Sequence, residues 1–146
     1  MKRLTDKTTM NKKICIGFFE DFSGEDSILI SVDINGLLEM EGVFLKLADG
    51  LPDFNFSELN LLDKEFRISL IAYNDTQNNG LRHTASGQFE WRATKAKWNE
   101  FREKLTALYR NGNIGHQYLD CEPADNGDLQ VVFSLDEYSM SFWTNS

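Results

Sequence analysis

Apolar and polar residues alternate along the segment 27–34, and this alternation limits what the chain can fold into more than any other feature. The apolar side chains fall at every second position, on one side of an extended strand. They are Ile28, Ile30, Val32 and Ile34. The run 13–22 has a similar pattern, and the turn-forming residues 23–26 separate the two segments. The pattern predicts a β-hairpin with one buried face.

The segment 94–109 is the strongest helix candidate. Its large apolar residues recur every three or four positions, as one face of an α-helix requires. They are Trp98, Phe101, Leu105 and Leu108. Thr94 is a suitable N-cap, and Asn111-Gly112 is a suitable stop. Glu100 and Lys104 lie four residues apart in the order that favours an ion pair.

Two more pairs of strands are expected. Segments 65–73 and 81–92 read as strands joined by a hairpin loop at 74–80, with a break possible at Ser86-Gly87. Segments 114–121 and 129–135 read as a second such pair. We therefore predict an α+β fold: a mainly antiparallel sheet of about six strands, with one or two helices packed on one face and the other face exposed.

The segment 37–50 is ambiguous between helix and strand. Its apolar residues fit a helical stripe, and Gly50 followed by Pro52 would end a helix. Gly42, however, would cost about 1 kcal/mol in a helix interior, and alternation at 43–47 also suits a strand. The helix is favoured. Phe54 and Phe56 are expected to anchor a loop at 51–62.

The chain length of 146 residues suits one domain. We expect a single α+β domain at 13–146, preceded by a flexible basic arm at 1–12, with Met1 or Met10 as the start. No internal repeat is visible. The longest strongly apolar stretch, 14–19, is too short to span a bilayer, and no signal peptide is recognisable, so no membrane partner is expected.

The net charge of −8 indicates which partners are favoured. A surface this acidic repels nucleic acid and attracts basic proteins. Cys15 and Cys121 lie in apolar runs and read as buried thiols, which is consistent with a reducing, cytoplasmic location.

No set of catalytic residues is apparent. The chain has only two histidines, His83 and His116, and strand alternation places His116, Tyr118 and Asp120 on the face opposite Cys121. His116 and Asp120 alone are too few ligands for a metal site. No glycine-rich phosphate loop occurs. No catalytic residue, metal or cofactor is therefore expected.

Three segments resemble small acidic bacterial proteins of the candidate toxin-immunity type. They are Ser86-Gly87-Gln88-Phe89-Glu90-Trp91, Gly115-His116-Gln117-Tyr118-Leu119-Asp120 and Val131-Val132-Phe133-Ser134-Leu135-Asp136-Glu137-Tyr138. The resemblance spans residues 86–143. It implies a cytoplasmic bacterial protein that binds a partner and has no enzymatic activity.

The leading hypothesis is a non-enzymatic protein-binding module, such as an immunity protein that inhibits a basic toxin domain through its acidic surface. The residues proposed for the contact face are Glu90, Arg92, His116, Tyr118 and Asp120. Tyr118 is the expected hot spot, because tyrosine buries a large area on binding.

Two alternatives remain open at this point. The first is an enzyme or small-ligand binder with a pocket between the sheet and the segment 37–62, lined by Phe44, Phe54 and Phe56. The second is a structural subunit that forms a homodimer through a sheet edge or the aromatic segment 138–143.

Overall fold

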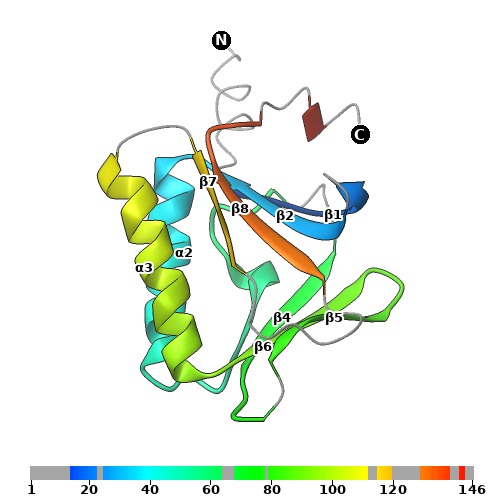
Figure 1. Ribbon diagram of the computed structural model, residues 1–146, viewed down its shortest axis with the longest axis vertical. Coiled ribbons are helices and arrows are strands. Elements are labelled where there is room, and N and C mark those ends of the chain that lie inside the picture. The colour runs from blue at the N-terminus through cyan, green and yellow to red at the C-terminus, as the bar shows by residue number, and fades with distance from the viewer. Residues whose placement is uncertain are drawn as a thin grey trace.

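The fold is seen in a computed structural model that describes residues 14–22, 25–63, 68–77, 79–111, 115–119, 129–138 and 142–143. The fold is α+β, as predicted (Figure 1). Along the chain run β1 (Ile14–Phe22), β2 (Glu25–Val32), α2 (Ile34–Ala48), β3 (Asp53–Asn55), the 3₁₀ turn η1 (Phe56–Glu58), β4 (Ser69–Asn74), β5 (Gly80–Ala85), β6 (Gln88–Ala93), α3 (Lys95–Asn111), β7 (Gly115–Tyr118) and β8 (Gln130–Leu135). The proposed arm at 1–12 lies outside the described residues.

The strands form two four-stranded sheets, so the predicted single, mainly antiparallel sheet is wrong. Sheet A has the order β1-β2-β8-β7 and sheet B the order β3-β4-β6-β5. In each sheet two antiparallel pairs meet through a parallel central pair, β2 with β8 and β4 with β6. Parallel pairing joins strands distant in sequence, which local alternation does not reveal.

The two halves of the chain repeat one structural plan. Each half of the chain has the order strand, strand, helix, strand, strand, and each sheet takes one pair of strands from each half. An offset of 61 residues carries Val32 onto Ala93 and Asn74 onto Leu135. In the parallel pairs, Val32 is the partner of Leu135, and Asn74 is the partner of Ala93. The backbone bonds Asp136 N–H to Val32 O and Asp75 N–H to Ala93 O repeat with the same offset.

The helices obey the same offset. The buried residues Leu37, Met40, Phe44 and Leu47 of α2 match Trp98, Phe101, Leu105 and Leu108 of α3, one for one. Both helices also begin with the same cap, in which a side-chain oxygen of the N-cap residue accepts from the backbone N–H three residues on. Asp33 accepts from Gly36 at 2.9 Å, and Thr94 accepts from Lys97 at 3.0 Å.

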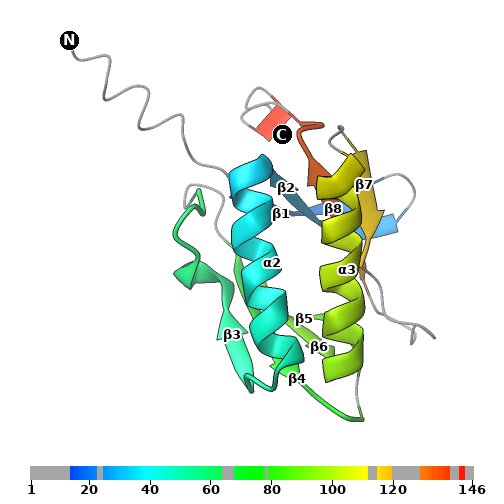
Figure 2. The ribbon, with the colours of Figure 1, turned by 90° about the vertical axis from the view of Figure 1, so that its left-hand side faces the viewer.

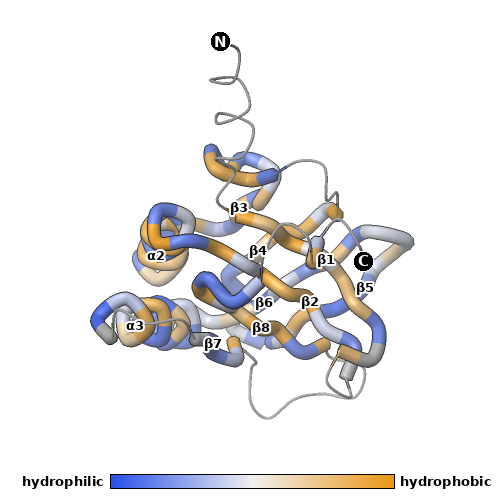
Figure 3. The backbone as a smooth tube through the Cα atoms, turned by 90° about the horizontal axis from the view of Figure 1, so that it is seen from above, coloured by the Kyte–Doolittle hydropathy of each residue, from blue (hydrophilic) through white to orange (hydrophobic). Residues whose placement is uncertain are grey.

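One core lies between the inner faces of the two sheets and the helix pair (Figures 1 and 3). Aromatic rings fill its centre: Phe44 contacts Trp91, Trp98 and Phe101 with centroid separations of 5.6–6.2 Å, and Phe56 lies 6.0 Å from Trp91. Because these rings come from both helices and from β6, their burial joins the helix pair to sheet B.

The segment 37–50 is helical, as favoured, but the helix begins earlier, at Ile34. The strand predicted to run to Ile34 therefore stops at Val32. Asp33 ends that strand and caps the helix instead, so that Ile34 is partly exposed rather than part of the alternating strand face. The cap bond to the Gly36 N–H outweighs the strand propensity of one isoleucine.

The predicted hairpin of 65–73 with 81–92 is wrong. Ser86 and Gly87 form a tight turn, with Gly87 at φ 70°, so 81–92 splits into β5 and β6, which pair with each other. β4 then pairs in parallel with β6. The pairs β1–β2 and β7–β8 are antiparallel, as expected. No described helix is long and apolar enough to cross a membrane.

The outer faces of the two sheets differ. On sheet A, Trp143 is buried against Cys15, Leu29 and Val132, with Phe142 beside it. On sheet B, the outward residues of β4 and β6 are half-buried or exposed, and Ile71 is the one aliphatic residue among them. The expectation of an exposed sheet face therefore applies to sheet B.

Candidate functional site

Five polar and aromatic residues form the candidate site on the outer face of sheet B, which we call the sheet B face. They are Tyr73, Asp75, Arg82, Glu90 and Arg92. The strand register places Tyr73 beside Arg92, and Glu90 beside Arg82. Their neighbours in sequence, such as Trp91, point into the core, so strand alternation fixes which side chains reach this face.

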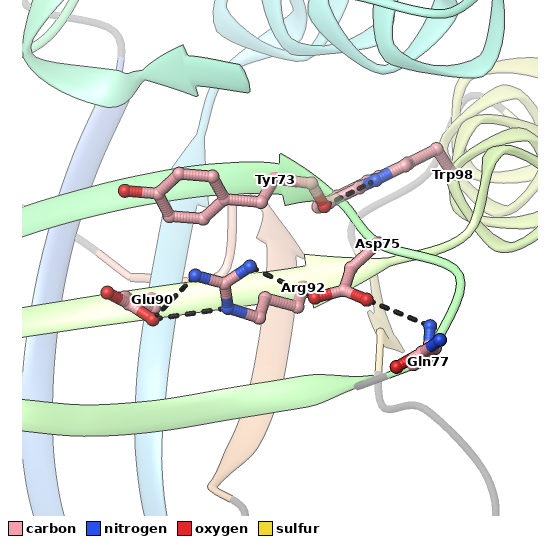
Figure 4. Close-up of polar contacts among 6 residues, drawn as sticks. All are labelled: Tyr73, Asp75, Gln77, Glu90, Arg92 and Trp98. Atoms are coloured by element: carbon pink, nitrogen blue, oxygen red, sulfur yellow. Dashed lines mark hydrogen bonds and ion pairs between the residues drawn. The ribbon is translucent and has the colours of Figure 1, made fainter. Parts of the chain in front are cut away.

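Arg92 lies at the centre of the sheet B face (Figure 4). Its guanidinium donates to Glu90 Oε1 through Nε at 3.2 Å and contacts the same oxygen through Nη2 at 3.1 Å. Its Nη1 donates to Asp75 Oδ2 at 3.0 Å. The same guanidinium lies 4.3 Å from the centroid of the Tyr73 ring, a cation–π contact.

The core holds this network in place. The Tyr73 carbonyl accepts from the buried Trp98 Nε1 at 3.3 Å, and the other oxygen of Asp75 accepts from the Gln77 backbone N–H at 2.8 Å (Figure 4). Burial alone would lower the pKa of Arg92, but its hydrogen bonds and charge contacts with Glu90 and Asp75 raise it. The site is therefore charged and preorganised, which reduces the entropy lost on binding.

A shallow depression of about 410 Å³ adjoins Arg92. It is lined by Asn79, Gly80, Arg82, Glu90 and Arg92. Gly80 is opposite Arg92 in the register and has no side chain, which leaves this space open. Since the φ of Gly80 is 125°, a larger residue there would be strained.

The residues proposed from sequence fall into two groups. Glu90 and Arg92 contact each other on sheet B, whereas His116 and Tyr118 contact each other on β7 of sheet A, with ring centroids 5.5 Å apart. Asp120 lies outside the described residues. His116 and Tyr118 do point outward and Leu119 is buried, as the alternation predicts.

His116 takes part in a polar chain that does not have the order of a catalytic triad. Its Nδ1 lies 3.0 Å from Glu137 Oε2, and the buried Ser134 donates to Glu137 Oε1 at 2.5 Å. A triad needs histidine between the hydroxyl and the carboxylate, and here the carboxylate is in the middle. Burial alone would raise the pKa of Glu137, but the bonds from Ser134 and His116 and the charge of His116 lower it.

The other candidate groups, His83 and Cys15, make packing contacts. The His83 ring stacks on Phe89 at 4.4 Å, on the exposed part of β5. Burial and the negative charge of Asp63 raise the pKa of the free Cys15 thiol to about 12, which makes it a poor nucleophile. Among the described residues, no group of three or more metal-ligating side chains occurs. Cys121 lies outside them.

The pocket proposed near the segment 37–62 is filled. Phe44 and Phe56 are core residues, and Phe54 packs edge-on against Phe56 at 5.5 Å. The segment expected to be a loop contains β3, which includes Phe54, and η1, which begins at Phe56, so the loop prediction is wrong there.

Sequence reasoning missed three members of the sheet B face: Tyr73, Asp75 and Arg82. Alternation in the 65–73 strand already places Tyr73 on the side opposite Leu70 and Ala72, so Tyr73 could have been found. Asp75 and Arg82 meet Arg92 and Glu90 only because β4 and β5 flank β6, which requires the three-dimensional pairing.

Comparisons with known proteins give no match. No protein-family model matches the chain, and no curated protein or solved structure matches it.

Proposed function

We propose that this chain is a non-enzymatic protein-binding module that docks a basic protein partner on the sheet B face. The observation that carries the proposal is the difference between the two outer sheet faces. The chain covers the face of sheet A with its own aromatic residues and leaves Tyr73, Glu90 and Arg92 of sheet B half-exposed. Tyrosine and arginine are among the residues enriched in binding hot spots.

Charge supports a basic partner. The segment 49–63, which includes the edge strand β3 of sheet B, contains four acidic residues and no lysine or arginine. Asp49, Asp53 and Glu58 are exposed there. A basic protein would be attracted to this border, and the paired charges of Arg92 and Glu90 would fix its orientation.

A bacterial toxin domain is the partner class that we propose. Toxin domains that act on nucleic acids have basic active sites, and an acidic protein can block such a site without chemistry of its own. The resemblance of residues 86–143 to immunity-type proteins supports the same class.

Site-specific photo-crosslinking tests the proposal. One variant of this chain carries a photoreactive amino acid at position 73. A second variant carries it at position 109, where the native residue is an exposed tyrosine on α3. We expect position 73 to crosslink one basic protein from native lysate at low salt, and position 109 not to. Mass spectrometry identifies the adduct, which is then purified for calorimetric titration.

The titration compares matched variants. Tyr73→Ala and Arg92→Ala should each weaken binding about 30-fold or more, as hot-spot truncations do. Tyr109→Ala and Arg110→Ala should leave it unchanged. If Tyr118→Ala were the only variant to lose binding, the contact surface would lie on β7 instead of the sheet B face. Absence of any crosslink at position 73, at low or high salt, would remove the basis of the proposal.

A further inference from the structure

The outer faces of the two sheets can be compared position by position. The helices α2 and α3 lie side by side in front of the central strands in Figure 2 and pack on the inner faces of the sheets. On the outer faces, the offset of 61 residues carries Leu29 of β2 onto Glu90 of β6 and Val132 of β8 onto Ile71 of β4. Leu29 pairs with Val132, as Glu90 pairs with Ile71, so the two outer faces correspond.

On sheet A, the corresponding place is filled by an indole ring. Trp143 packs on Cys15, Leu29 and Val132. The ring also lies against Gly17, which is opposite Leu29 in the register and leaves room for it. The fold therefore holds a tryptophan on one of its two outer sheet faces.

The depression on the sheet B face lies at the matching position. In β5, Arg82 is opposite Glu90, as Gly17 of β1 is opposite Leu29. We call this depression the sheet B seat, because it is the counterpart of the place that Trp143 fills on sheet A. The residues that line it are Asn79, Gly80, Arg82, Glu90 and Arg92.

The charges of the sheet B seat favour an aromatic ring over an ion. Arg82 and Arg92 are positive and Glu90 is negative, so a fully charged group of either sign meets repulsion as well as attraction. An aromatic ring has electron-rich faces, which stack on guanidinium groups, and a positive edge, which suits a carboxylate. A guanidinium can stack through its faces while its N–H groups hold hydrogen bonds, as those of Arg92 do with Glu90 and Asp75.

Asn79 adds a hydrogen-bond acceptor to the sheet B seat. Its Oδ1 is a buried atom, and within the part of the chain that the structure describes no group donates to it. Buried acceptors in native proteins nearly always have a donor. The indole N–H of tryptophan is a donor without acceptor capacity, so a tryptophan can satisfy Asn79 while its ring stacks on arginine.

We propose that the sheet B seat binds a tryptophan side chain, which the partner supplies. The inference rests on the proposed function and names the residue that the partner contributes beside Arg92. The indole ring stacks on the guanidinium groups of the seat, and its N–H donates to Asn79 Oδ1. Tryptophan is enriched in binding hot spots, as tyrosine and arginine are.

An NMR titration of the full chain with N-acetyl-tryptophanamide tests the seat without the partner. We expect the backbone amide signals of Asn79, Gly80 and Arg82 to shift, with a Kd of about 1 mM for so small a ligand. N-acetyl-lysinamide, which carries a full positive charge, should leave these signals unchanged. No shift of the Gly80 signal at about 10 mM tryptophan probe would overturn the inference, as would equal affinity for the two probes.

Methylation of the indole nitrogen tests the hydrogen bond to Asn79. The methylated probe keeps the ring but has no N–H, so it should bind the wild-type chain about tenfold more weakly than the parent probe. The variant Asn79→Leu should bind both probes equally, whereas Asn60→Leu, at an exposed asparagine, should keep the tenfold preference. The same preference in Asn79→Leu as in the wild type would mean that the methyl group is excluded by its size, and would contradict the bond.

The two sets of experiments separate this inference from the proposed function. Binding of the tryptophan probe at Gly80 without any crosslinked protein at position 73 would confirm the seat and contradict the proposed function. A crosslinked partner at position 73 without binding of the probe would support the proposed function and overturn the seat.

Discussion

At the scale of single residues, Gly17 makes room for Trp143 on sheet A. A Cβ atom at Gly17 would lie 2.7 Å from Cζ3 of the Trp143 ring, which is too close for ordinary contact. Trp143 also lies 5.5 Å from the Phe19 ring and is almost fully buried. The cover of sheet A therefore depends on the absence of one side chain from β1.

We expect Gly17→Ala to lower the free energy of unfolding by about 1–3 kcal/mol, as overpacking does. Urea denaturation measures this change. The control is a double-mutant cycle with Trp143→Ala. Since the clash is with the indole ring, Gly17→Ala should have little effect in the Trp143→Ala background. An equal cost in both backgrounds would mean that Trp143 does not pack on Gly17.

Glu137 should make stability depend on pH. Its native pKa lies below the ordinary value of 4.5, so the ionised form stabilises the fold above that pH. This stabilisation is lost as the pH falls through the lowered native pKa. The difference in unfolding free energy between the wild type and Glu137→Gln should therefore narrow from about pH 5 downward. A difference that stays constant down to about pH 2 would contradict the pairing with Ser134 and His116.

At the scale of elements, Asn74 links the end of α2 to sheet B. Its Nδ2 donates to the carbonyls of Leu47 and Leu51, both at 2.7 Å. Leu47 lies in the last turn of α2 and its carbonyl also accepts from the Gly50 backbone N–H at 3.1 Å, whereas Leu51 follows the helix. The equivalent residue in the second half of the chain is Leu135, which cannot form such bonds.

Asn74→Ala should therefore destabilise the protein by about 1–3 kcal/mol, because the Leu51 carbonyl loses the donor from Asn74 and the Leu47 carbonyl keeps the Gly50 N–H but loses its second donor. Thermal and urea denaturation would measure the change. Asn60→Ala is the matched control, since the Asn60 side chain is exposed and the bond to Glu39 is made by its backbone N–H, which alanine keeps. Equal effects of the two substitutions would mean that the Asn74 bonds contribute nothing.

The sequence predicts the elements better than their pairing. The α3 spacing, the Thr94 cap and the β1–β2 pair are local patterns, and each is confirmed. The expected Glu100–Lys104 pair is wrong: Glu100 pairs with Lys97 at 3.1 Å, and Lys104 donates to the Tyr118 carbonyl at 2.7 Å. That carbonyl belongs to the edge strand β7, whose position next to α3 is set by tertiary structure.

The internal structural repeat could not be seen in the sequence for a related reason. The matched core positions are conserved in burial but not in residue type: Leu37 corresponds to Trp98 and Met40 to Phe101. Volume can be exchanged between neighbouring core positions as long as the total is kept. The two halves thus have one plan of buried positions and two different sets of side chains.

At the scale of the whole molecule, the two halves are interlocked. Each sheet consists of one strand pair from each half, so neither half can complete a four-stranded sheet alone. Separate strand pairs are only marginally stable in water. The molecule is therefore one cooperative unit despite its duplicated plan.

Fragments 1–77 and 78–146 should each be largely unfolded alone and should regain the native circular dichroism spectrum when mixed. The reason is that the parallel pairs β2–β8 and β4–β6 both cross the cut. Calorimetric titration of one fragment with the other measures the association, and Trp98→Ala should weaken it, since that ring contacts Phe44 of the other fragment. A cooperative melting transition in either fragment alone would contradict the interlocking.

The origin of the strands in each sheet also sets the order in which the two sheets can form while the chain is being synthesised. Sheet B uses only residues 53–93, whereas sheet A joins residues 14–32 to residues 115–135. During synthesis, the edge of β2 that pairs with β8 therefore stays without its partner until almost all of the described chain has emerged from the ribosome. An apolar edge of this kind is prone to misassembly. The interval before β8 arrives is the period in which a growing chain of this design is most exposed to aggregation.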